Sequence, residues 1–357
     1  MLTNIHIDIL LPIGGQGGVE NVVNKIAPYL QKQGACVRVV QFVWAGIHWV
    51  HESLAFYPLV NDGGEYSSEQ LIGHYTGFMT HQGKPDIILA TAWPLMTLVA
   101  QESLKRLNKG TCKIISWPHQ SIDVYASTGC GGMEYLALSD AIFALNQKTY
   151  NMIKAHNKDC KVFIVKNPVN FTQCPIQPAW ITKDRTLLFV GRLAAQKRVD
   201  IILEAVSLAK DTWKLILIGE GEEEGTLQEL VRFLHIERQV YFMGWIDNPW
   251  ETISGISAFV MASDYECLPL SAIESLASGI PVISTPVDGI IEIIKPGING
   301  FLYPLKDSRR LADILDAMAD GILPVPAPEA CRESVMDFEE TEVLCVFAKN
   351  LVEVLNK

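Results

Sequence analysis

Short hydrophobic runs alternate with amphipathic segments along nearly the whole chain. In the first half, runs rich in β-branched residues predict strands over 5–10, 35–43, 86–90, 113–117, 141–145 and 162–165. In the second half, the same pattern predicts strands over 186–190, 214–218, 240–243, 258–261 and 282–284. Segments with helical periodicity lie between several of these runs, at 19–33, 95–107 and 147–156. Buried strands that alternate with helices predict an α/β fold with doubly wound parallel sheets.

The α/β pattern is interrupted in two places. Residues 170–184 contain Pro175 and Pro178 and follow no clear period, and residues 323–328 read Leu-Pro-Val-Pro-Ala-Pro. We therefore predict an N-terminal Rossmann-like domain over 1–170, a linker over 171–184 and a C-terminal Rossmann-like domain over 185–328. The remaining residues, 329–357, predict one or two helices that are free to pack anywhere, including back on the N-terminal domain.

Two Rossmann-like domains that face each other would form a cleft lined by the carboxyl ends of both sheets. Ligands of open α/β sheets bind at that edge. We therefore expect the chemistry to lie in loops that directly follow strands.

Composition excludes several classes of protein. Of the 357 residues, 49% are hydrophobic and 19% are charged, which is typical of a folded chain rather than a disordered one. The formal net charge of −11 argues against a protein dedicated to nucleic-acid binding, because nucleic acids are also negatively charged. The eight cysteines form no Cys-x-x-Cys pair and no cluster with zinc-ligand spacing, so they indicate reduced thiols in a cytosolic protein.

Neither a signal peptide nor a membrane span is predicted. Asp8 lies within the first apolar stretch, which is unlike a secretory signal. The longest apolar stretch, 87–100, contains Pro94 and is too short to cross a bilayer. We expect a soluble, cytoplasmic chain.

A glycine-rich loop follows the first predicted strand, with the sequence Gly14-Gly-Gln-Gly17-Gly18 before a helix. Glycines allow close approach of a ligand to the backbone, and a helix N-terminus offers unpaired N–H groups to an anion. The loop lacks the Lys-Ser/Thr of a P-loop and departs from Gly-x-Gly-x-x-Gly spacing. Three interpretations of this loop are therefore kept: a phosphate-binding loop, a tight strand-to-helix turn and a route of access for an acceptor.

Two cations follow the strand predicted at 186–190. Arg192 and Lys197 lie five residues apart, and a helix comes after them. An arginine fork and a lysine point charge can hold a diphosphate from two sides. The alternative is a solvated basic loop.

Two carboxylates follow the strand predicted at 258–261. Glu266 lies in the loop, and Glu274 lies more than one turn inside a helix that we predict to begin at Pro269. Carboxylate oxygens accept hydrogen bonds from vicinal hydroxyls, so this pair suits a sugar and a ribose. An exposed loop glutamate and an ordinary helix glutamate are the alternative, which the apolar surroundings of Glu274 disfavour.

These motifs occur in an order that resembles a known family. Gly-Gly-Val-Glu at 17–20, Gly-Arg-x4-Lys at 191–197, Gly-Glu-Gly at 219–221 and Glu-x7-Glu at 266–274 are followed by Ala-Ser-Gly-Ile-Pro-Val at 277–282 and Gly-Ile-Asn-Gly-Phe-Leu at 297–302. Together they resemble the GT4 family of retaining glycosyltransferases with the GT-B fold. The stretches 116–123, 241–245 and 248–251 look like its lipopolysaccharide galactosyltransferase branch.

The resemblance implies a role for each matching residue. Arg192 and Lys197 would bind the diphosphate of a nucleotide-sugar donor, a UDP-sugar in the first instance. Glu274 would bind the ribose and Glu266 the donor sugar. The backbone of Met243, Gly244 and Trp245 would contact the base. Gly17 and Gly18 would contact the diphosphate, and His119 would contact the sugar.

One stretch departs from the family pattern. Where family members commonly read Glu-Gly-Phe-Gly, this chain reads Glu266-Cys-Leu-Pro269. The change removes an easy positive-φ position and one N–H donor, so phosphate contacts from that backbone are placed in doubt. His119 follows Trp117-Pro118 at a predicted strand end, where a site role competes with that of an ordinary structural histidine.

The implied reaction uses no metal and no cofactor. No Asp-x-Asp occurs in the sequence, so a metal-bridged diphosphate is not predicted and the cations must stabilise the leaving group. The resemblance implies retention by front-face attack. A nicotinamide dehydrogenase would need a clean Gly-x-Gly-x-x-Gly with an acidic residue about 20 positions later. A hydrolysing nucleotide-sugar epimerase and a non-catalytic nucleotide-sugar-binding protein would share the fold and compete with the transferase interpretation.

The acceptor is expected to be a glycan or glycolipid, in the synthesis of a cell-surface polysaccharide or lipopolysaccharide. Residues 1–175 hold 13 Lys+Arg and 12 Asp+Glu, which leaves 29 − 13 = 16 and 40 − 12 = 28 for the rest, so the acidity belongs to the second half. Basic residues of the first half could contact the inner face of a membrane, although a solvated face is the simpler interpretation. These residues are Lys105, Arg106, Lys109, Lys113, Lys148, Lys154, Lys158 and Lys161. The aromatic-rich segment at 42–57 could form a saccharide platform, a membrane-facing loop or a mixture of core and surface.

Overall fold

The chain divides into two compact units. A computed structural model describes residues 2–15, 17–44, 46–60, 64–108, 110–177 and 185–356. Unit 1 comprises Met1–Pro168 and Thr341–Lys357, and unit 2 comprises Val169–Glu340. The described part of the predicted linker, 171–177, thus belongs to unit 2, and its remaining residues, 178–184, lie outside the described residues. The predicted C-terminal segment 329–357 is shared, because the division falls after residue 340 rather than 328.

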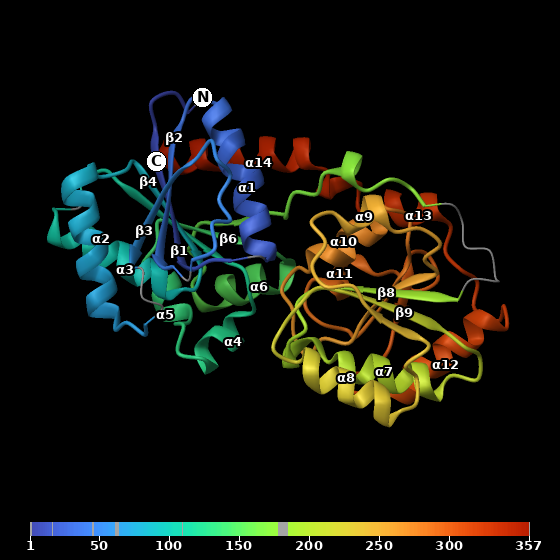
Figure 1. Ribbon diagram of the computed structural model, residues 1–357. Helices are drawn as coiled ribbons and strands as arrows, with labels where there is room; N and C mark the ends of the chain where they lie inside the picture. Colours follow the sequence, from blue (N-terminus) through green and yellow to red (C-terminus); the bar gives the residue numbers. More distant parts are fainter. Residues whose placement is uncertain are drawn as a thin grey trace. The chain divides into compact units, whose positions relative to one another are not determined.

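Unit 1 is built on a seven-stranded sheet in the order β3-β2-β1-β4-β5-β6-β7, in which every pair of neighbours is parallel (Figure 1). The strands are β1 (His6–Ile13), β2 (Cys36–Val43), β3 (Ala55–Val60), β4 (Ile87–Ala92), β5 (Lys113–Pro118), β6 (Ala141–Ala144) and β7 (Val162–Ile164). The helices are α1 (Gly18–Lys32), α2 (Ser68–Gln82), α3 (Leu95–Arg106), α4 (Ile122–Ser127), α5 (Met133–Leu136), α6 (Gln147–His156) and α14 (Glu340–Leu355).

The last helix, α14, returns to unit 1. Its Phe347 ring lies 5.1 Å from Trp117 of β5 and 5.2 Å from Phe143 of β6, measured between ring centroids. All three side chains are buried. Lys161 and Glu353 add an ion pair between the β7 edge and α14. Burial of these aromatic rings fixes the C-terminal helix on the sheet that the N-terminal half builds.

Unit 2 is built on a six-stranded sheet in the order β10-β9-β8-β11-β12-β13, again with parallel neighbours. The strands are β8 (Thr186–Val190), β9 (Lys214–Ile218), β10 (Val240–Phe242), β11 (Ala258–Met261), β12 (Val282–Ser284) and β13 (Gly300–Leu302). The helices are α7 (Val199–Leu208), α8 (Glu224–Phe233), α9 (Pro249–Thr252), α10 (Leu270–Ala277), α11 (Ile290–Ile293), α12 (Ser308–Ala319) and α13 (Pro328–Glu333).

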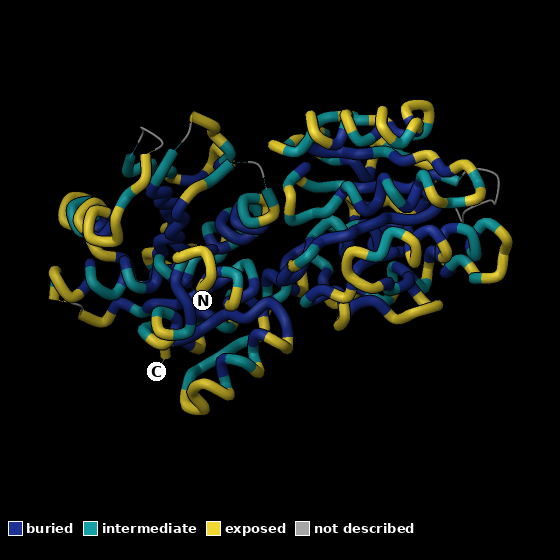
Figure 2. Tube along the Cα trace, turned by 90° about the horizontal axis from the view of Figure 1, so that it is seen from below, coloured by how far each residue is buried: buried dark blue, intermediate teal, exposed yellow. Residues whose placement is uncertain are grey.

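Both sheets form the buried centres of their units. The central strands of both sheets are buried and the helices alternate between buried and exposed turns (Figure 2). The strands β3, β7 and β10 at the sheet edges are only partly buried. A core cluster of unit 2 contains Trp213, Phe189 and the apolar faces of α7 and α12. Strands buried on both faces are the reason that their sequences read as continuous apolar runs.

The α/β class with two Rossmann-like sheets is therefore confirmed. Strands predicted at 186–190, 214–218, 258–261 and 282–284 coincide with β8, β9, β11 and β12. The helix predicted to begin at Pro269 begins one residue later, because Pro269 has extended backbone and serves as the N-cap of α10. Among the described residues, no helix combines the length and apolar character that a bilayer crossing requires.

Candidate functional site

The carboxyl edge of the unit 2 sheet gathers most of the predicted donor-binding residues. Arg192 and Lys197 follow β8, Trp245 follows β10, and Glu266 follows β11. Because all neighbours in this sheet are parallel, the loops after these strands share one edge. The arrangement is the one expected of a ligand site in an open α/β sheet.

Lys197 and Glu266 form an ion pair at the centre of this edge. The Nζ atom of Lys197 lies 2.6 Å from Oε1 of Glu266, although 69 residues separate them in sequence. The Glu266 residue is only 8% exposed. Its Oε1 also accepts a hydrogen bond of 2.9 Å from the Ser263 hydroxyl. The carboxylate is thereby fixed through one oxygen by a cation and a hydroxyl.

Backbone contacts hold the two loops together around this pair. The Gln196 side chain donates to the carbonyl oxygen of Tyr265 at 2.7 Å, and the Asp264 N–H donates to the carbonyl oxygen of Gln196 at 2.9 Å. On the other side, the Thr285 hydroxyl donates to the carbonyl oxygen of Ser263 at 2.7 Å. The β11–α10 loop is therefore tied to its neighbours after both β8 and β12.

Arg192 differs from Lys197 in having no partner among the described residues of unit 2. Its side chain is exposed, and within that part of the chain it makes no ion pair or side-chain hydrogen bond. A guanidinium group that is not engaged can bind a phosphate with two parallel hydrogen bonds. Of the two cations predicted to bind the diphosphate, Lys197 is thus engaged and Arg192 is not.

Arg198, the residue after Lys197, stabilises the same turn through two ion pairs. It has a left-handed backbone with φ of 48°, and its guanidinium contacts Asp200 at 2.8 Å and Asp264 at 3.6 Å. The hydrogen bonds to Asp200 and the charge of Asp264 raise the pKa of this guanidinium above its usual range. These ion pairs hold a strained residue in place between Lys197 and α7.

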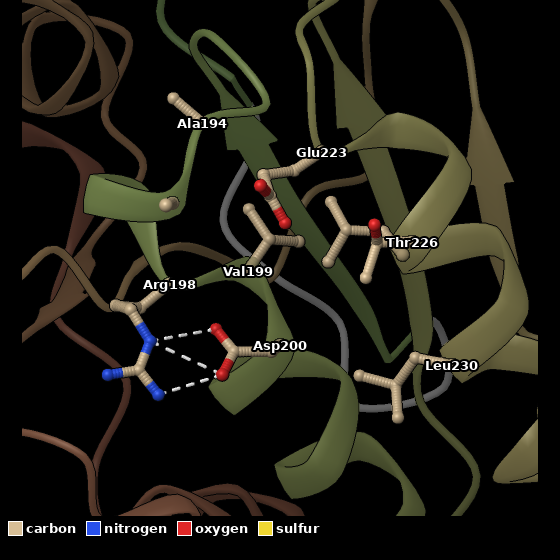
Figure 3. Close-up of a pocket in the computed structure, with 9 residues that line it drawn as sticks. Ala194, Arg198, Val199, Asp200, Glu223, Thr226 and Leu230 are labelled. Atoms are coloured by element: carbon tan, nitrogen blue, oxygen red, sulfur yellow. Dashed lines mark hydrogen bonds and ion pairs between the residues drawn. The ribbon is translucent and has the colours of Figure 1, made fainter.

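A cavity of about 240 Å³ lies beside this turn, between residues of α7 and α8. Figure 3 shows the residues that line it. Ala194, Arg198 and Asp200 line one side of it, and Thr226 and Leu230 of α8 line the other. None of the predicted donor-binding residues lines this cavity. It belongs to the packing between α7 and α8 rather than to the predicted donor site.

Close backbone packing between neighbouring loops explains the glycines at this edge. A Cβ atom on Gly219 would overlap the carbonyl oxygen of Gly191, and Gly219 has φ of 130°. The Gly219 N–H in turn donates to the carbonyl oxygen of Gly244 at 2.8 Å. Backbones after β8, β9 and β10 therefore lie directly against one another.

We expect Gly219→Ala to destabilise the protein by about 2 kcal/mol or more and to weaken nucleotide binding, because the added methyl group forces these loops apart. Gly225→Ala is the matched control, since Gly225 lies in α8 with open space around its Cβ position. That control should be neutral or stabilising. Thermal unfolding and nucleotide titration measure both effects, and equal melting temperatures for the two variants would contradict the prediction.

The predicted base-binding segment is partly exposed and internally braced. Met243 and Trp245 are 53% and 44% exposed. The Trp245 N–H donates weakly to the Glu220 carboxylate at 3.4 Å, and its indole N–H donates to Asp247 at 2.9 Å. Gly244 has a left-handed φ of 67°. Apolar surface held in a fixed backbone turn suits contact with a flat base, and this role stays a prediction.

Glu274 lies on α10, and its Oε2 accepts a hydrogen bond of 3.0 Å from the indole N–H of Trp250. Trp250 belongs to α9, directly after the predicted base-binding segment. The sequence pattern indicated no site role for Trp250. Trp250 lies in the Asn-Pro-Trp-Glu stretch at 248–251, which resembles the family. It is 24 residues from Glu274, and nothing in the sequence predicts that the two side chains meet.

In unit 1, Gly17 is the N-cap of α1 and Gly18 is its first residue. The Glu20 carboxylate folds back over this turn and accepts a hydrogen bond of 2.8 Å from the Gly15 N–H. A Cβ atom on Gly17 would lie 2.9 Å from the other Glu20 oxygen. Gly17 therefore makes room for the Glu20 side chain, and the predicted contact of Gly17 and Gly18 with a diphosphate stays a prediction.

His119 directly follows β5 and packs against Trp117, with ring centroids 4.4 Å apart. Its Nε2 is buried and has no hydrogen-bond partner among the described residues. Burial lowers the pKa of this imidazole to about 3. The ring is therefore neutral at physiological pH, where it can donate or accept a hydrogen bond but contributes no charge. Its predicted contact with the donor sugar is not tested by this geometry.

Several cations of the predicted basic region are paired within unit 1. The pairs are Lys105–Glu102, Arg106–Glu69, Lys113–Asp140 and Lys161–Glu353. Lys109 lies outside the described residues. Pairing reduces the positive field that a membrane surface would meet. Peripheral membrane contact stays a prediction.

The aromatic segment after β2 is held against the glycine-rich loop. The Trp49 indole N–H donates to the Gln41 side chain at 2.7 Å, and a Cβ atom on Gly14 would overlap the same indole. His48 stacks on Phe56 at 5.5 Å. Part of this segment is thus packed rather than free, and its role toward an acceptor stays a prediction. Among the described residues, no group of three or more His, Cys, Asp or Glu side chains is arranged to hold a metal ion.

Comparison with known proteins identifies a family that matches unit 2. Residues 172–333 match the family described as glycosyl transferases group 1. A lipopolysaccharide 1,6-galactosyltransferase of Escherichia coli K12 is 28% identical over 252 residues, which are 68% of each chain. The Salmonella typhimurium protein of the same name is 30% identical over 227 residues, and the chain spans only 61% of its length. An uncharacterized glycosyltransferase of Haemophilus influenzae is 27% identical over 326 residues, 87% of this chain and 89% of its own.

Solved structures show the same fold across nearly the whole chain. The lipopolysaccharide outer core galactosyltransferase WaaB in its apo form is 23% identical, with a TM-score of 0.78 over 98% of this chain and 99% of that one. Anabaena HepE in complex with UDP and glucose is 18% identical, with a TM-score of 0.80 over 98% and 100%. At these identities the likeness establishes a shared fold.

Proposed function

Because residues 172–333 match the family of glycosyl transferases group 1, we propose that this chain is such a transferase and moves a hexose from a UDP-linked sugar onto a saccharide or lipid-linked glycan. The proposal places this reaction in the synthesis of a lipopolysaccharide or another cell-surface polysaccharide. The observation that carries it is the turn after β8, where Arg192 is unengaged within the described part of unit 2 and Lys197 contacts Glu266 at 2.6 Å. Cations for a diphosphate and a carboxylate for sugar hydroxyls thus lie on adjoining loops.

The donor and the pathway rest on the relatives. HepE, which has the same fold, was solved with UDP and glucose. The two lipopolysaccharide 1,6-galactosyltransferases carry galactose in their names. A hexose of the gluco or galacto series on UDP is therefore the donor class that we propose.

In the proposed step, the bond between the sugar C1 and the diphosphate oxygen breaks while a bond from C1 to the acceptor oxygen forms on the same face. The departing diphosphate oxygen takes the proton of the acceptor hydroxyl. Arg192 and Lys197 stabilise the negative charge that grows on the diphosphate, as fixed cations do at low energetic cost of rearrangement. The same cations make a metal ion unnecessary for this step. Glu266 accepts hydrogen bonds from the sugar, and Glu274 accepts them from the ribose, so neither acts as a nucleophile.

We expect UDP release from a UDP-hexose to depend on the acceptor, to persist in excess EDTA and to yield a product with the donor's anomeric configuration. The experiment screens UDP- and GDP-sugars against oligosaccharide and lipid-linked acceptors, with product configuration read by NMR. Equal UDP release without acceptor would instead indicate a hydrolysing epimerase. Donor binding with no turnover would indicate a binding protein, and loss of turnover in EDTA with recovery by added Mg²⁺ would contradict metal independence.

A further inference from the structure

Trp250 connects the predicted base-binding segment to the predicted ribose-binding carboxylate. It is 3% exposed and lies on the short helix α9, which follows Trp245 in sequence. Its indole N–H donates to Oε2 of Glu274 at 3.0 Å. Figure 1 shows α9 beside α10, the helix that carries Glu274.

The indole itself is held by the sheet. The Trp250 ring packs against Phe259 of β11 with ring centroids 6.2 Å apart, and both side chains are buried. Pro249, at the first position of α9, fixes the backbone immediately before it. The position of the indole N–H is therefore set by the core of unit 2 and not by an exposed rotamer.

This hydrogen bond limits the freedom of the glutamate. An indole N–H can only donate, and a bond from it to a carboxylate is stronger than one between neutral groups. A glutamate that is free to rotate loses side-chain entropy when it binds a ligand. A glutamate already held in one rotamer avoids most of that loss.

We propose that Trp250 is a positioning residue that holds Glu274 in the orientation that accepts hydrogen bonds from the vicinal hydroxyls of a ribonucleotide. It thereby contributes to the preference for ribose over deoxyribose. The proposal rests on the proposed function, in which Glu274 binds the ribose of the donor. It adds the residue that makes this recognition selective.

The test compares two ligands in Trp250→Phe, which keeps an aromatic ring and removes the N–H. The probes are UDP and 2′,3′-dideoxy-UDP, titrated calorimetrically. In the native protein UDP should bind about tenfold more tightly than the dideoxy analogue. In Trp250→Phe we expect UDP to bind about fivefold more weakly and the dideoxy analogue to bind unchanged. With the UDP-hexose donor, KM should rise while kcat stays constant.

Two further variants separate the possible failures. Trp213→Phe removes a buried indole directly before β9, at the opposite edge of the same sheet, and should leave both affinities unchanged. Glu274→Gln should abolish most of the preference for UDP, and if it does not, the ribose assignment in the proposed function is wrong. If Glu274→Gln behaves as expected but Trp250→Phe weakens both ligands equally, or neither, the positioning role is wrong. No binding of either nucleotide to the native protein would overturn both.

Discussion

Replacing Arg192 with alanine is expected to lower kcat by about two to three orders of magnitude, with a smaller change in KM for the donor. The Arg192 side chain is exposed and has no ion-pair partner in the described part of unit 2, so its charge is available to the leaving diphosphate. Loss of one fixed charge-stabilising donor from a transition state costs about this much. Lys197 remains in the variant as a second cation, but its charge is shared with Glu266, so it does not compensate for the lost guanidinium.

Arg185→Ala is the matched control for this prediction. Arg185 lies directly before β8 and pairs with Asp211 at 2.9 Å, whereas Arg192 follows the other end of the same strand. The control removes the same charge from the amino edge of the sheet and should leave turnover unchanged. Steady-state kinetics with a UDP-hexose and its acceptor provide the measurement. Similar kcat values for Arg192→Ala and native protein would rule out a role in leaving-group stabilisation.

The sequence predicted the central strands well because burial on both faces leaves an unbroken apolar signal. It missed β3 and β13, which form the outer edges of the two sheets. Pro58 lies within β3, and a proline is tolerated there because an edge strand has one unpaired side. The strand β13 has only three residues, and its first residue is Gly300, a residue type that weakens a strand pattern.

Helix α2 was also missed, although the residues at its N-terminus have a pattern typical of a helix start. Two glycines, Gly73 and Gly77, weaken the helical pattern. However, Ser67 and Gln70 form a capping box, in which the Gln70 N–H donates to the Ser67 hydroxyl and the Gln70 side chain accepts from the Ser67 N–H. A search for caps would have located this helix where periodicity failed.

The site was predictable as a set of loops but not as a set of contacts. Parallel strands bring Lys197 and Glu266 to one edge, and that much follows from the α/β pattern. Their 2.6 Å ion pair depends on how the two loops bend, and the sequence contains no signal for it. The Trp250–Glu274 hydrogen bond and the left-handed Arg198 depend in the same way on tertiary packing.

A second large effect is expected in unit 1, where Arg38→Leu should lower the free energy of unfolding by about 3–5 kcal/mol at about pH 8. Asp8 is fully buried in β1, and its carboxylate accepts hydrogen bonds from Arg38 at 2.6 and 3.0 Å and from the Tyr75 hydroxyl at 2.8 Å. Arg38 also donates to the carbonyl oxygens of Gln82 and Gly83. Its removal would leave a buried carboxylate without a cation. Arg106→Leu, which breaks an exposed pair with Glu69, should cost about 1 kcal/mol or less.

The loss in the free energy of unfolding of Arg38→Leu should become smaller as the pH falls. The direction of this change follows from the pKa of Asp8. Burial raises the pKa of the Asp8 carboxyl, and Arg38 opposes that rise. Without Arg38 the folded-state pKa rises further above the unfolded value, so the folded variant takes up a proton at a higher pH. Such a group favours folding as the pH falls through its folded-state pKa. Urea denaturation of Arg38→Leu at about pH 8 and about pH 5 should therefore show the larger loss at the higher pH.

Adding Asp8→Asn should recover part of that loss, because a neutral amide is less costly to bury than an unpaired charge. A loss that is equal at both pH values, or unchanged by Asp8→Asn, would show that Arg38 stabilises unit 1 through contacts other than its ion pair with Asp8.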